Sequence, residues 1–466
     1  MKFLRWPLLN HFGVSLVLAL ILRILSAIYS YGPQSLDDYR HGLFPGLQMS
    51  EGQPLNMPGY RNQVLVWGVC AVLNLCKLLG ITSHLSQLQW LYFIIGLVSL
   101  LSIVGIYLLF KNSESRLLPI AVLYVVALSP GLTFISTRIL GESVGTSFLI
   151  LACGCFYQHT RTLRLIWLIS SCVFLGIATI FRFQIGIVYP LFIFFLLCSR
   201  QYRSAVWTIA VGFLILGVQA GIDVLSNRAP LETLWNYFIE FGTTPWYSTW
   251  LTIFGFALLP FSFGLWSALK RWWSQYWQLS VVVVFFTFVH SLIPHKEERF
   301  LFPLYPVVLV SLVYLWYYSR KKRAVKYIFV PFFLAFSMVA LVFGVLSNSQ
   351  ESVVGPVARL KKTPQVPQII VDISPQFGVF GLREFFIERN QKYLEVNSVA
   401  EININRSIEL VVLTSKESYP FDIEKELASQ HWDCESFQKF QSLSDQLVYS
   451  LSKSANMRRM PSWRSI

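Results

Sequence analysis

The sequence has little charge. Only 13% of its 466 residues are Asp, Glu, Lys or Arg, against about 25% in ordinary soluble domains. Hydrophobic residues make up 55% and aromatic residues 16%, and the mean hydropathy is +0.54. The apolar residues are grouped in runs of about 20, the length that crosses a hydrocarbon core of about 30 Å as a helix. This composition excludes an ordinary soluble protein and predicts an all-α polytopic membrane protein.

Motifs for metals and nucleotides are also missing. The seven cysteines are scattered, and no CxxC pair or Cys/His spacing indicates zinc. No glycine-rich nucleotide-binding loop is present. The net charge is +14, but the bases stand in short clusters between apolar runs, which is the pattern of cytoplasmic loops. We therefore expect no metal site and no nucleic-acid partner.

The apolar runs predict about 11 transmembrane helices. The first run, at 12–29, could be a signal peptide, but no small-residue cleavage site follows, and we expect a retained span. The run at 64–79 is short and contains Asn74 and Lys77, which favours an interfacial helix over a crossing. The predicted spans are 12–29, 91–110, 117–135, 144–157, 165–181, 185–198, 205–222, 251–269, 279–293, 300–318 and 327–346.

The loops between these spans separate by charge. If the N-terminus is cytoplasmic, the inside loops carry many Lys and Arg residues with Glu114 as their one acid, whereas acids gather in the opposite loops. The positive-inside rule supports this topology. Counting 64–79 as a full span would destroy the separation.

The composition changes after the last apolar run. Residues 349–466 are polar, with strand-like runs at 368–373, 408–414 and 446–451 and helical candidates at 379–390 and 422–430. This alternation predicts a small non-cytoplasmic α/β domain. The predicted division is thus a transmembrane domain at 1–348 and a soluble domain at 349–466.

Acidic and mixed-charge groups gather on the predicted outer face. An enzyme that joins a sugar to a hydroxyl needs a base for the hydroxyl proton and cations for the leaving phosphate, and charge beside hydrocarbon usually marks a functional site. Taken singly, these residues could also be solvated turns, interface residues or an aromatic belt. The candidates are Asp37, Asp38, Arg138, Glu142, Arg182, Asp223, Asn236, Trp246, Tyr247, His295, Lys296, Glu297, Glu298 and Arg299.

One stretch matches a known family. HKEERF at 295–300, followed by a short apolar step and Pro-x-Tyr-Pro at 303–306, resembles the signature of the eukaryotic mannosyltransferases that extend GPI anchors and lipid-linked N-glycan precursors. Weaker likenesses follow the same order: Asp37-Asp38-Tyr39 to an acidic pair in the first lumenal loop, Arg182 to an arginine after a middle span, and the loop at 223–247 to one with an Asp and a Pro-Trp-aromatic element. The sequence departs from the family at 56–62 and at Arg182-Phe183-Gln184, where the family has Arg-Pro-Thr.

The resemblance implies the C-type glycosyltransferase fold and transfer of a hexose, with mannose first among the candidates. The donor would be a polyprenyl-phosphate sugar and the acceptor a lipid-linked glycan or glycolipid, with inversion and without metal or other cofactor. Asp37 or Asp38 would act as the base, and His295, Lys296 and Arg299 would hold the donor phosphate. The remaining candidates would contact the substrates: Arg138, Glu142, Arg182, Asp223, Asn236, Trp246, Tyr247, Glu297 and Glu298.

The resemblance leaves the compartment and one alternative class open. The reacting face would be the periplasm if the chain lies in a bacterial inner membrane, or the ER lumen if it is eukaryotic, and the departures favour a bacterial relative. Besides membrane lipids, the expected partners are the donor and the acceptor. A non-catalytic membrane scaffold or a transporter of lipid-linked sugars stays open as the alternative.

Overall fold

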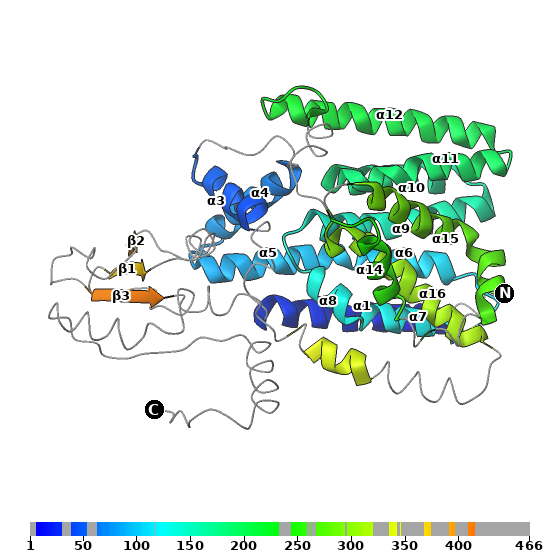
Figure 1. Ribbon diagram of the computed structural model, residues 1–466, viewed down its shortest axis with the longest axis horizontal. Coiled ribbons are helices and arrows are strands. Elements are labelled where there is room, and N and C mark those ends of the chain that lie inside the picture. Colours follow the sequence, from blue (N-terminus) through cyan, green and yellow to red (C-terminus); the bar gives the residue numbers. More distant parts are fainter. Residues whose placement is uncertain are drawn as a thin grey trace.

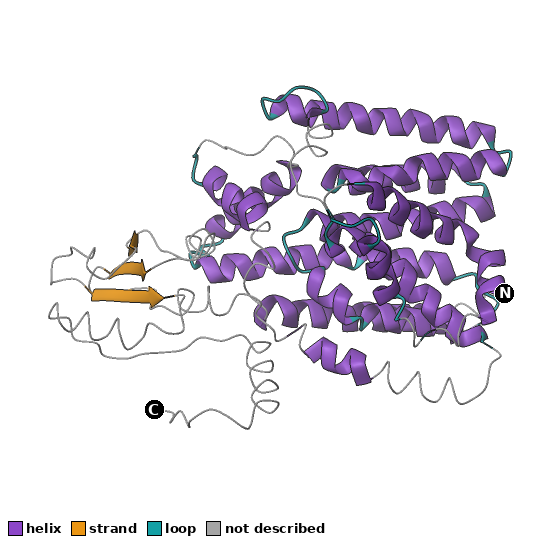
Figure 2. Cartoon of the chain, viewed as in Figure 1, coloured by secondary structure: helices purple, strands orange, loops and turns teal. Residues whose placement is uncertain are grey.

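The longer helices lie along one axis of the molecule (Figures 1 and 2). The computed structural model describes residues 6–29, 39–53, 63–115, 117–232, 244–258, 262, 267–293, 296–319, 335–342, 345, 368–373, 391–396 and 409–414. The α-helices are α1 (Trp6–Tyr29), α3 (Phe44–Ser50), α4 (Gln63–Leu78), α5 (His84–Ser99), α6 (Leu101–Phe110), α7 (Leu117–Ala127), α8 (Pro130–Ile135), α9 (Gly141–Thr162), α10 (Leu165–Phe181), α11 (Val188–Cys198), α12 (Tyr202–Leu225), α14 (Ser248–Phe256), α15 (Leu269–Leu292) and α16 (Tyr305–Tyr318). Shorter turns of other helix types are η2 (Tyr39–Leu43), η3 (Phe183–Ile187) and η5 (Glu298–Leu304).

Several helices are suited to a bilayer. Among the described residues, five helical segments are long and apolar enough to cross a membrane: Leu8–Tyr29, His84–Phe110, Tyr202–Leu225, Leu269–Leu292 and Glu298–Tyr318. Further apolar helices, such as α7 and α10, are shorter. The chain is a multi-pass membrane protein, as its composition predicts. The count of eleven spans stays a prediction, and the span expected at 327–346 lies largely outside the described residues.

Two predicted spans are broken. The run at 117–135 divides into α7 and α8 because Ser129 is extended and Pro130 starts the second helix, where the Ser129 hydroxyl accepts from the Leu132 amide. The run at 251–269 also divides: α14 ends at Phe256, Leu258 has a positive φ of 52°, and Leu269 already belongs to α15. A hydropathy window averages over many residues, and those around the breaks are mostly apolar, so the breaks do not lower it enough to be recognised.

Arg23 lies in the middle of α1 and does not interrupt the helix. Its side chain is fully buried, and it donates from Nε to the Ser99 hydroxyl at 3.1 Å and from Nη1 to the Ala127 carbonyl at 3.0 Å. Ala127 is the last residue of α7, whose final carbonyls have no helical partner. A cation at a helix C-terminus satisfies such carbonyls and opposes the helix dipole. The charge in the first span therefore stabilises the break between α7 and α8.

Close backbone packing joins α6 to α9 in the main core. A Cβ atom on Gly154 would lie 2.5 Å from the Gly105 carbonyl oxygen, so a side chain at Gly154 would not fit. Without a hydrophobic driving force between helices in lipid, such contacts between small residues are a main source of stability. Around this contact, one apolar core joins α6, α7, α9, α10, α11, α15 and α16.

A second apolar cluster lies beside α3 and α4. Leu47 of α3 packs with Val69 and Leu73 of α4 and with Leu88 of α5, outside the main core. Among the helices, α3 and α4 lie on the side away from the N-terminus (Figure 1). The helix predicted at 64–79 is present as α4, and its position at a membrane interface stays a prediction.

The C-terminal part contains a three-stranded parallel sheet. The strands are β1 (Gln368–Ile373), β2 (Gln391–Val396) and β3 (Glu409–Thr414), in the order β2-β1-β3, with Gln368 opposite both Gln391 and Glu409. The predictions of β1 and β3 are confirmed, whereas β2 was missed because Lys392 and Glu395 obscure its pattern. The helices predicted at 379–390 and 422–430 and the strand at 446–451 lie outside the described residues, so the α/β domain itself stays a prediction.

Candidate active site

The candidate site lies where α9 begins, at Glu142. This residue lies in the first turn of α9, where a carboxylate interacts favourably with the helix dipole, and its side chain is 3% exposed. Gly141 allows this turn to approach the end of α10, because a Cβ atom at Gly141 would lie 2.5 Å from the Phe181 carbonyl oxygen. The next residue, Arg182, caps α10 with extended backbone angles.

This approach creates a buried ion pair. Nη2 of Arg182 lies 3.0 Å from Oε1 of Glu142, and the Arg182 side chain is 11% exposed. The same guanidinium lies over the ring of Phe300, with Cζ 4.5 Å from the ring centroid. Arg182 and Glu142 were predicted on two different outer loops, and the structure brings them into contact.

Arg299 joins the pair from η5, within the HKEERF stretch. Its Nε lies 2.5 Å from Oε2 of Glu297 and 3.9 Å from Oε1 of Glu142. Glu297 is 33% exposed and Arg299 is 16% exposed. We call Glu142, Arg182, Glu297, Arg299 and Phe300 the Glu142 cluster. Its exposure increases from Glu142 outward to Glu297, so the two guanidiniums lie between a buried carboxylate and the outside.

The Glu142 cluster has a chemistry suited to a phosphate. Guanidinium groups bind phosphate through paired N–H donors. With two bases and two acids the cluster is formally neutral, which avoids an uncompensated buried charge. An incoming phosphate could replace the outer carboxylate, Glu297, on Arg299 while Glu142 continues to hold both arginines in position.

Lys296 binds the neighbouring loop. Its backbone N–H donates to the Thr244 hydroxyl and its ammonium Nζ to the Thr244 carbonyl, each at 2.8 Å. Burial lowers the pKa of Lys296. Two and three residues after Thr244, Trp246 and Tyr247 are 65% and 51% exposed, with their rings edge to face. The stretch at 296–299 thus connects the Glu142 cluster to exposed aromatic side chains.

The other described candidates lie apart from these contacts. Arg138 is fully buried, with its guanidinium 4.7 Å from the Tyr92 ring centroid and 4.4 Å from that of Phe134. Asp223 is 1% exposed and accepts from Nε2 of Gln219 at 3.1 Å, one turn earlier on α12. Glu298 is exposed at the start of η5. Asp37, Asp38, Asn236 and His295 lie outside the described residues, so their roles stay predictions.

Two residues outside the predicted set, Phe300 and Thr244, also contact the site. Phe300 follows Arg299 directly but begins the predicted span at 300–318, and Thr244 stands two residues before Trp246. His290, in the last turn of α15, is a buried packing residue. It is 2% exposed, its Nδ1 lies 2.8 Å from the Phe286 carbonyl, and its ring stacks on that of Phe286.

The loops predicted as cytoplasmic come together at the other end of the helices. Nη2 of Arg271 lies 3.3 Å from Oε2 of Glu114, and Nη1 of Arg161 donates to the Asn112 carbonyl at 3.2 Å. These contacts join the end of α6, the end of α9 and the start of α15. The predicted separation of basic loops from the Glu142 cluster therefore holds in three dimensions.

Solved structures share this fold at low sequence identity. ArnT from Cupriavidus metallidurans, bound to undecaprenyl phosphate, superposes with a TM-score of 0.57 at 12% identity over 93% of this chain and 96% of that one. The oligosaccharyltransferase AglB from Archaeoglobus fulgidus, in complex with an inhibitory peptide and a dolichol-phosphate, gives a TM-score of 0.52 at 12% identity over 84% of this chain and 65% of that one. The fold is that of C-type membrane glycosyltransferases.

The family follows from the sequence comparison. The model of the Alg9-like mannosyltransferase family matches residues 66–365, and the chain belongs to this family. It is 27% identical over 197 residues to GPI mannosyltransferase 3 of Drosophila melanogaster, covering 38% of this chain and 34% of that protein. It is 30% identical over 111 residues to Mannosyltransferase APTG1 of Arabidopsis thaliana, covering 22% of this chain and 20% of that protein. The chain thus spans about a third or less of the length of these relatives.

Proposed function

We propose that this protein is a membrane glycosyltransferase that transfers a hexose from a polyprenyl-phosphate donor to a lipid-linked glycan or glycolipid. Mannose is the first candidate for the hexose, and transfer inverts the anomeric centre. The observation that carries the proposal is the Glu142 cluster. Two guanidiniums converge at the end of the bundle opposite to the basic loops, in a chain of the Alg9-like mannosyltransferase family.

The chemistry requires one base and a cationic phosphate site. The acceptor hydroxyl oxygen forms the new bond to the anomeric carbon while the bond to the phosphate oxygen breaks. The hydroxyl proton passes to a carboxylate, and the lipid phosphate leaves with the bonding electrons. In this proposal Asp37 or Asp38 takes the proton, and Arg299 and Lys296, with His295, stabilise the leaving phosphate.

The remaining candidates receive supporting roles. Glu142 holds both Arg182 and Arg299, and Glu297 pairs with Arg299 until the phosphate arrives. Trp246 and Tyr247 offer exposed aromatic faces for a sugar of the acceptor. Asn236 and Glu298 would contact the substrates, whereas buried Arg138 and Asp223 would act through their neighbours. No metal ion is part of the proposal, and the reacting face is the ER lumen or the bacterial periplasm.

The scaffold or transporter alternative gains less support. The match to a mannosyltransferase family favours an enzyme. A transporter would carry its ionisable residues near the middle of broken helices. The Glu142 cluster instead lies at helix ends, where α9 begins, α10 ends and η5 begins.

The test is a transfer assay on the purified full chain in detergent. Polyprenyl-phosphate carrying tritiated mannose is incubated with a lipid extract of the host, beside Asp37→Asn, Asp38→Asn and Arg299→Ala. We expect label in a new lipid product with wild type, loss with Arg299→Ala and with one aspartate variant, and full activity of Arg203→Ala. Unchanged transfer in EDTA is expected as well. If none of the mannose, glucose, galactose and arabinose donors gave transfer, the transferase proposal would be refuted and the scaffold alternative would be favoured.

A further inference from the structure

Thr244 accepts hydrogen bonds from two different parts of Lys296. The Lys296 backbone N–H donates to the Thr244 hydroxyl, and the ammonium Nζ donates to the Thr244 carbonyl, each at 2.8 Å. The two residues are 52 positions apart in the sequence. We call this pair of bonds the Thr244 clamp. It joins the segment before α14 to the segment that carries the predicted phosphate ligands.

The two segments joined by the clamp are anchored differently. The later one is fixed in the core, because Phe300 is 6% exposed and η5 packs against α9 and α16. The earlier one is an exposed turn that leads into α14. In this turn the Ser248 amide and hydroxyl both donate to the carbonyl of exposed Pro245, at 3.1 Å and 2.8 Å. Loss of the clamp should therefore displace residues 244–247 and leave η5 in place.

The segment at 244–247 carries the exposed aromatic pair, Trp246 and Tyr247. Their ring centroids are 6.1 Å apart and the rings are nearly perpendicular. Joining two substrates requires that both reacting groups be held in one geometry. A sugar held by the aromatic pair can meet the donor only if the pair keeps its position relative to the phosphate ligands. The Thr244 clamp is a direct bond between these two parts.

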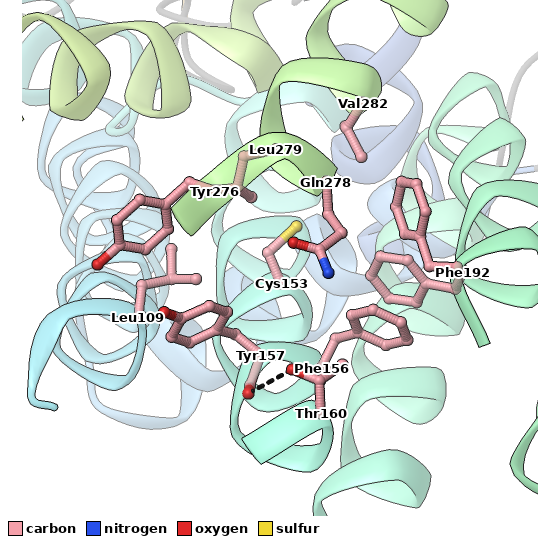
Figure 3. A pocket seen from close by; sticks show the side chains of 11 residues that line it. Leu109, Cys153, Phe156, Tyr157, Thr160, Phe192, Tyr276, Gln278, Leu279 and Val282 are labelled. Atoms are coloured by element: carbon pink, nitrogen blue, oxygen red, sulfur yellow. Dashed lines mark hydrogen bonds between the residues drawn. The ribbon is translucent and has the colours of Figure 1, made fainter. Parts of the chain in front are cut away.

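A small internal space does not offer the acceptor another site. It lies between α9, α11 and α15 and measures about 20 Å³, which is room for about one water molecule (Figure 3). Its lining is largely apolar and includes Cys153, Phe192 and Val282. A sugar does not fit there, whereas the aromatic pair is open to the outside.

We propose that Thr244 is a positioning residue of the transferase. By binding Lys296 at two points, it sets the position of Trp246 and Tyr247, and of an acceptor sugar stacked on their rings, relative to the donor phosphate. This inference rests on the proposed function. An ammonium group has three N–H donors, so Lys296 can bind the Thr244 carbonyl and a donor phosphate at the same time. The clamp thus connects the acceptor site to the donor site.

Transfer kinetics separate this role from a structural one. Tritiated mannosyl polyprenyl phosphate and a host lipid extract are varied in turn on the purified full chain in detergent. Thr244→Val keeps the branched shape and the carbonyl but loses the hydroxyl. We expect the amount of extract for half-maximal rate to rise about fivefold, as for one lost hydrogen bond, with the donor KM within about twofold of wild type. Thr244→Ser keeps the hydroxyl and should behave like wild type.

Two further variants connect the effect to the aromatic pair. Thr252→Val is the matched control, because it removes a hydroxyl that donates to the Ser248 carbonyl at 3.0 Å within α14, and it should behave like wild type. Trp246→Ala should raise the half-maximal amount of extract by itself. Adding Thr244→Val should then change little more, because both substitutions act on one contact. Additive effects in the double variant, or equal increases for donor and acceptor, would overturn the proposal.

Hydrogen exchange tests the clamp without relying on activity. Mass spectrometry of peptides covering 244–250 reports how far this segment is protected in the purified full chain. We expect faster exchange in Thr244→Val than in wild type, Thr244→Ser or Thr252→Val. Equal exchange in all four proteins, beside an active wild type, would refute the role of Thr244 alone. A wild type that transfers no sugar would instead refute the transferase itself.

Discussion

Oε1 of Glu142 lies 3.0 Å from Nη2 of Arg182 and 3.9 Å from Nε of Arg299. One carboxylate, 3% exposed, therefore positions two guanidiniums that come from helices far apart in the sequence. In a membrane protein this arrangement costs desolvation energy, which makes a purely stabilising role a poor explanation. We infer that the arrangement serves to hold two cations in position to bind an anion.

Removing the Glu142 carboxylate should damage both stability and transfer. Glu142→Gln leaves Arg182 and Arg299 without their shared acid, and breaking a buried ion pair costs about 3–5 kcal/mol. We expect a lower unfolding temperature and transfer reduced at least about tenfold. Thermal unfolding and the mannose-transfer assay measure the two effects.

The matched control for Glu142 is at the opposite end of the helices. Glu114→Gln breaks the Arg271–Glu114 pair, whose side chains are 45% and 74% exposed. Such a surface pair is worth about 0–1 kcal/mol. Equal effects of the two substitutions would contradict the assigned role of Glu142.

Donor binding by Arg299 should depend on the shape of its side chain as well as on its charge. Its Nε lies near Glu142 and Glu297, and a planar guanidinium can offer paired N–H donors to a phosphate, which a single ammonium cannot. We expect Arg299→Lys to fold normally but to raise the KM for the donor about tenfold or more. A donor KM equal to that of wild type would exclude Arg299 from the phosphate site.

Gly141 should be intolerant of a methyl group. In Gly141→Ala the new Cβ would meet the Phe181 carbonyl at 2.5 Å, so α9 and α10 must separate. We expect a loss of about 1–3 kcal/mol, as for other overpacked sites, together with lower transfer because Glu142 moves away from Arg182. Gly217→Ala is the control, because no atom lies within 4 Å of its added Cβ. A stable and fully active Gly141→Ala variant would show that the close approach is dispensable.

Donor binding should weaken at alkaline pH. Burial favours the neutral form of Lys296 and lowers its pKa below the usual lysine value. Because only the charged ammonium attracts phosphate, the donor KM should rise as the pH passes through this lowered pKa, earlier than for a solvated lysine. The rise should be smaller in Lys296→Arg, since a guanidinium stays charged over this range. Identical pH profiles of the two proteins would exclude titration of Lys296 as the cause.

Much of the architecture could be predicted from the sequence because the bilayer acts on local composition. Long apolar runs and the charge of the loops between them predict helices and their order, and α10 agrees with the predicted run at 165–181. Helix breaks were less predictable. The ends of α7 and α14 depend on Pro130 and on the backbone at Leu258, which hydropathy does not register.

The sequence by itself determined the class of protein, the family signature at 295–306 and the set of charged candidates. Only the tertiary structure decided which of them meet. Glu142, Arg182 and Arg299 converge because Gly141 allows α9 to touch the end of α10 and because η5 packs against α9. Arg138 and Asp223 are also charged candidates, but Arg138 contacts Tyr92 and Asp223 contacts Gln219, apart from the Glu142 cluster. Ion pairing requires contact within a few ångströms, and helix packing over long sequence separations is what brings these side chains so close.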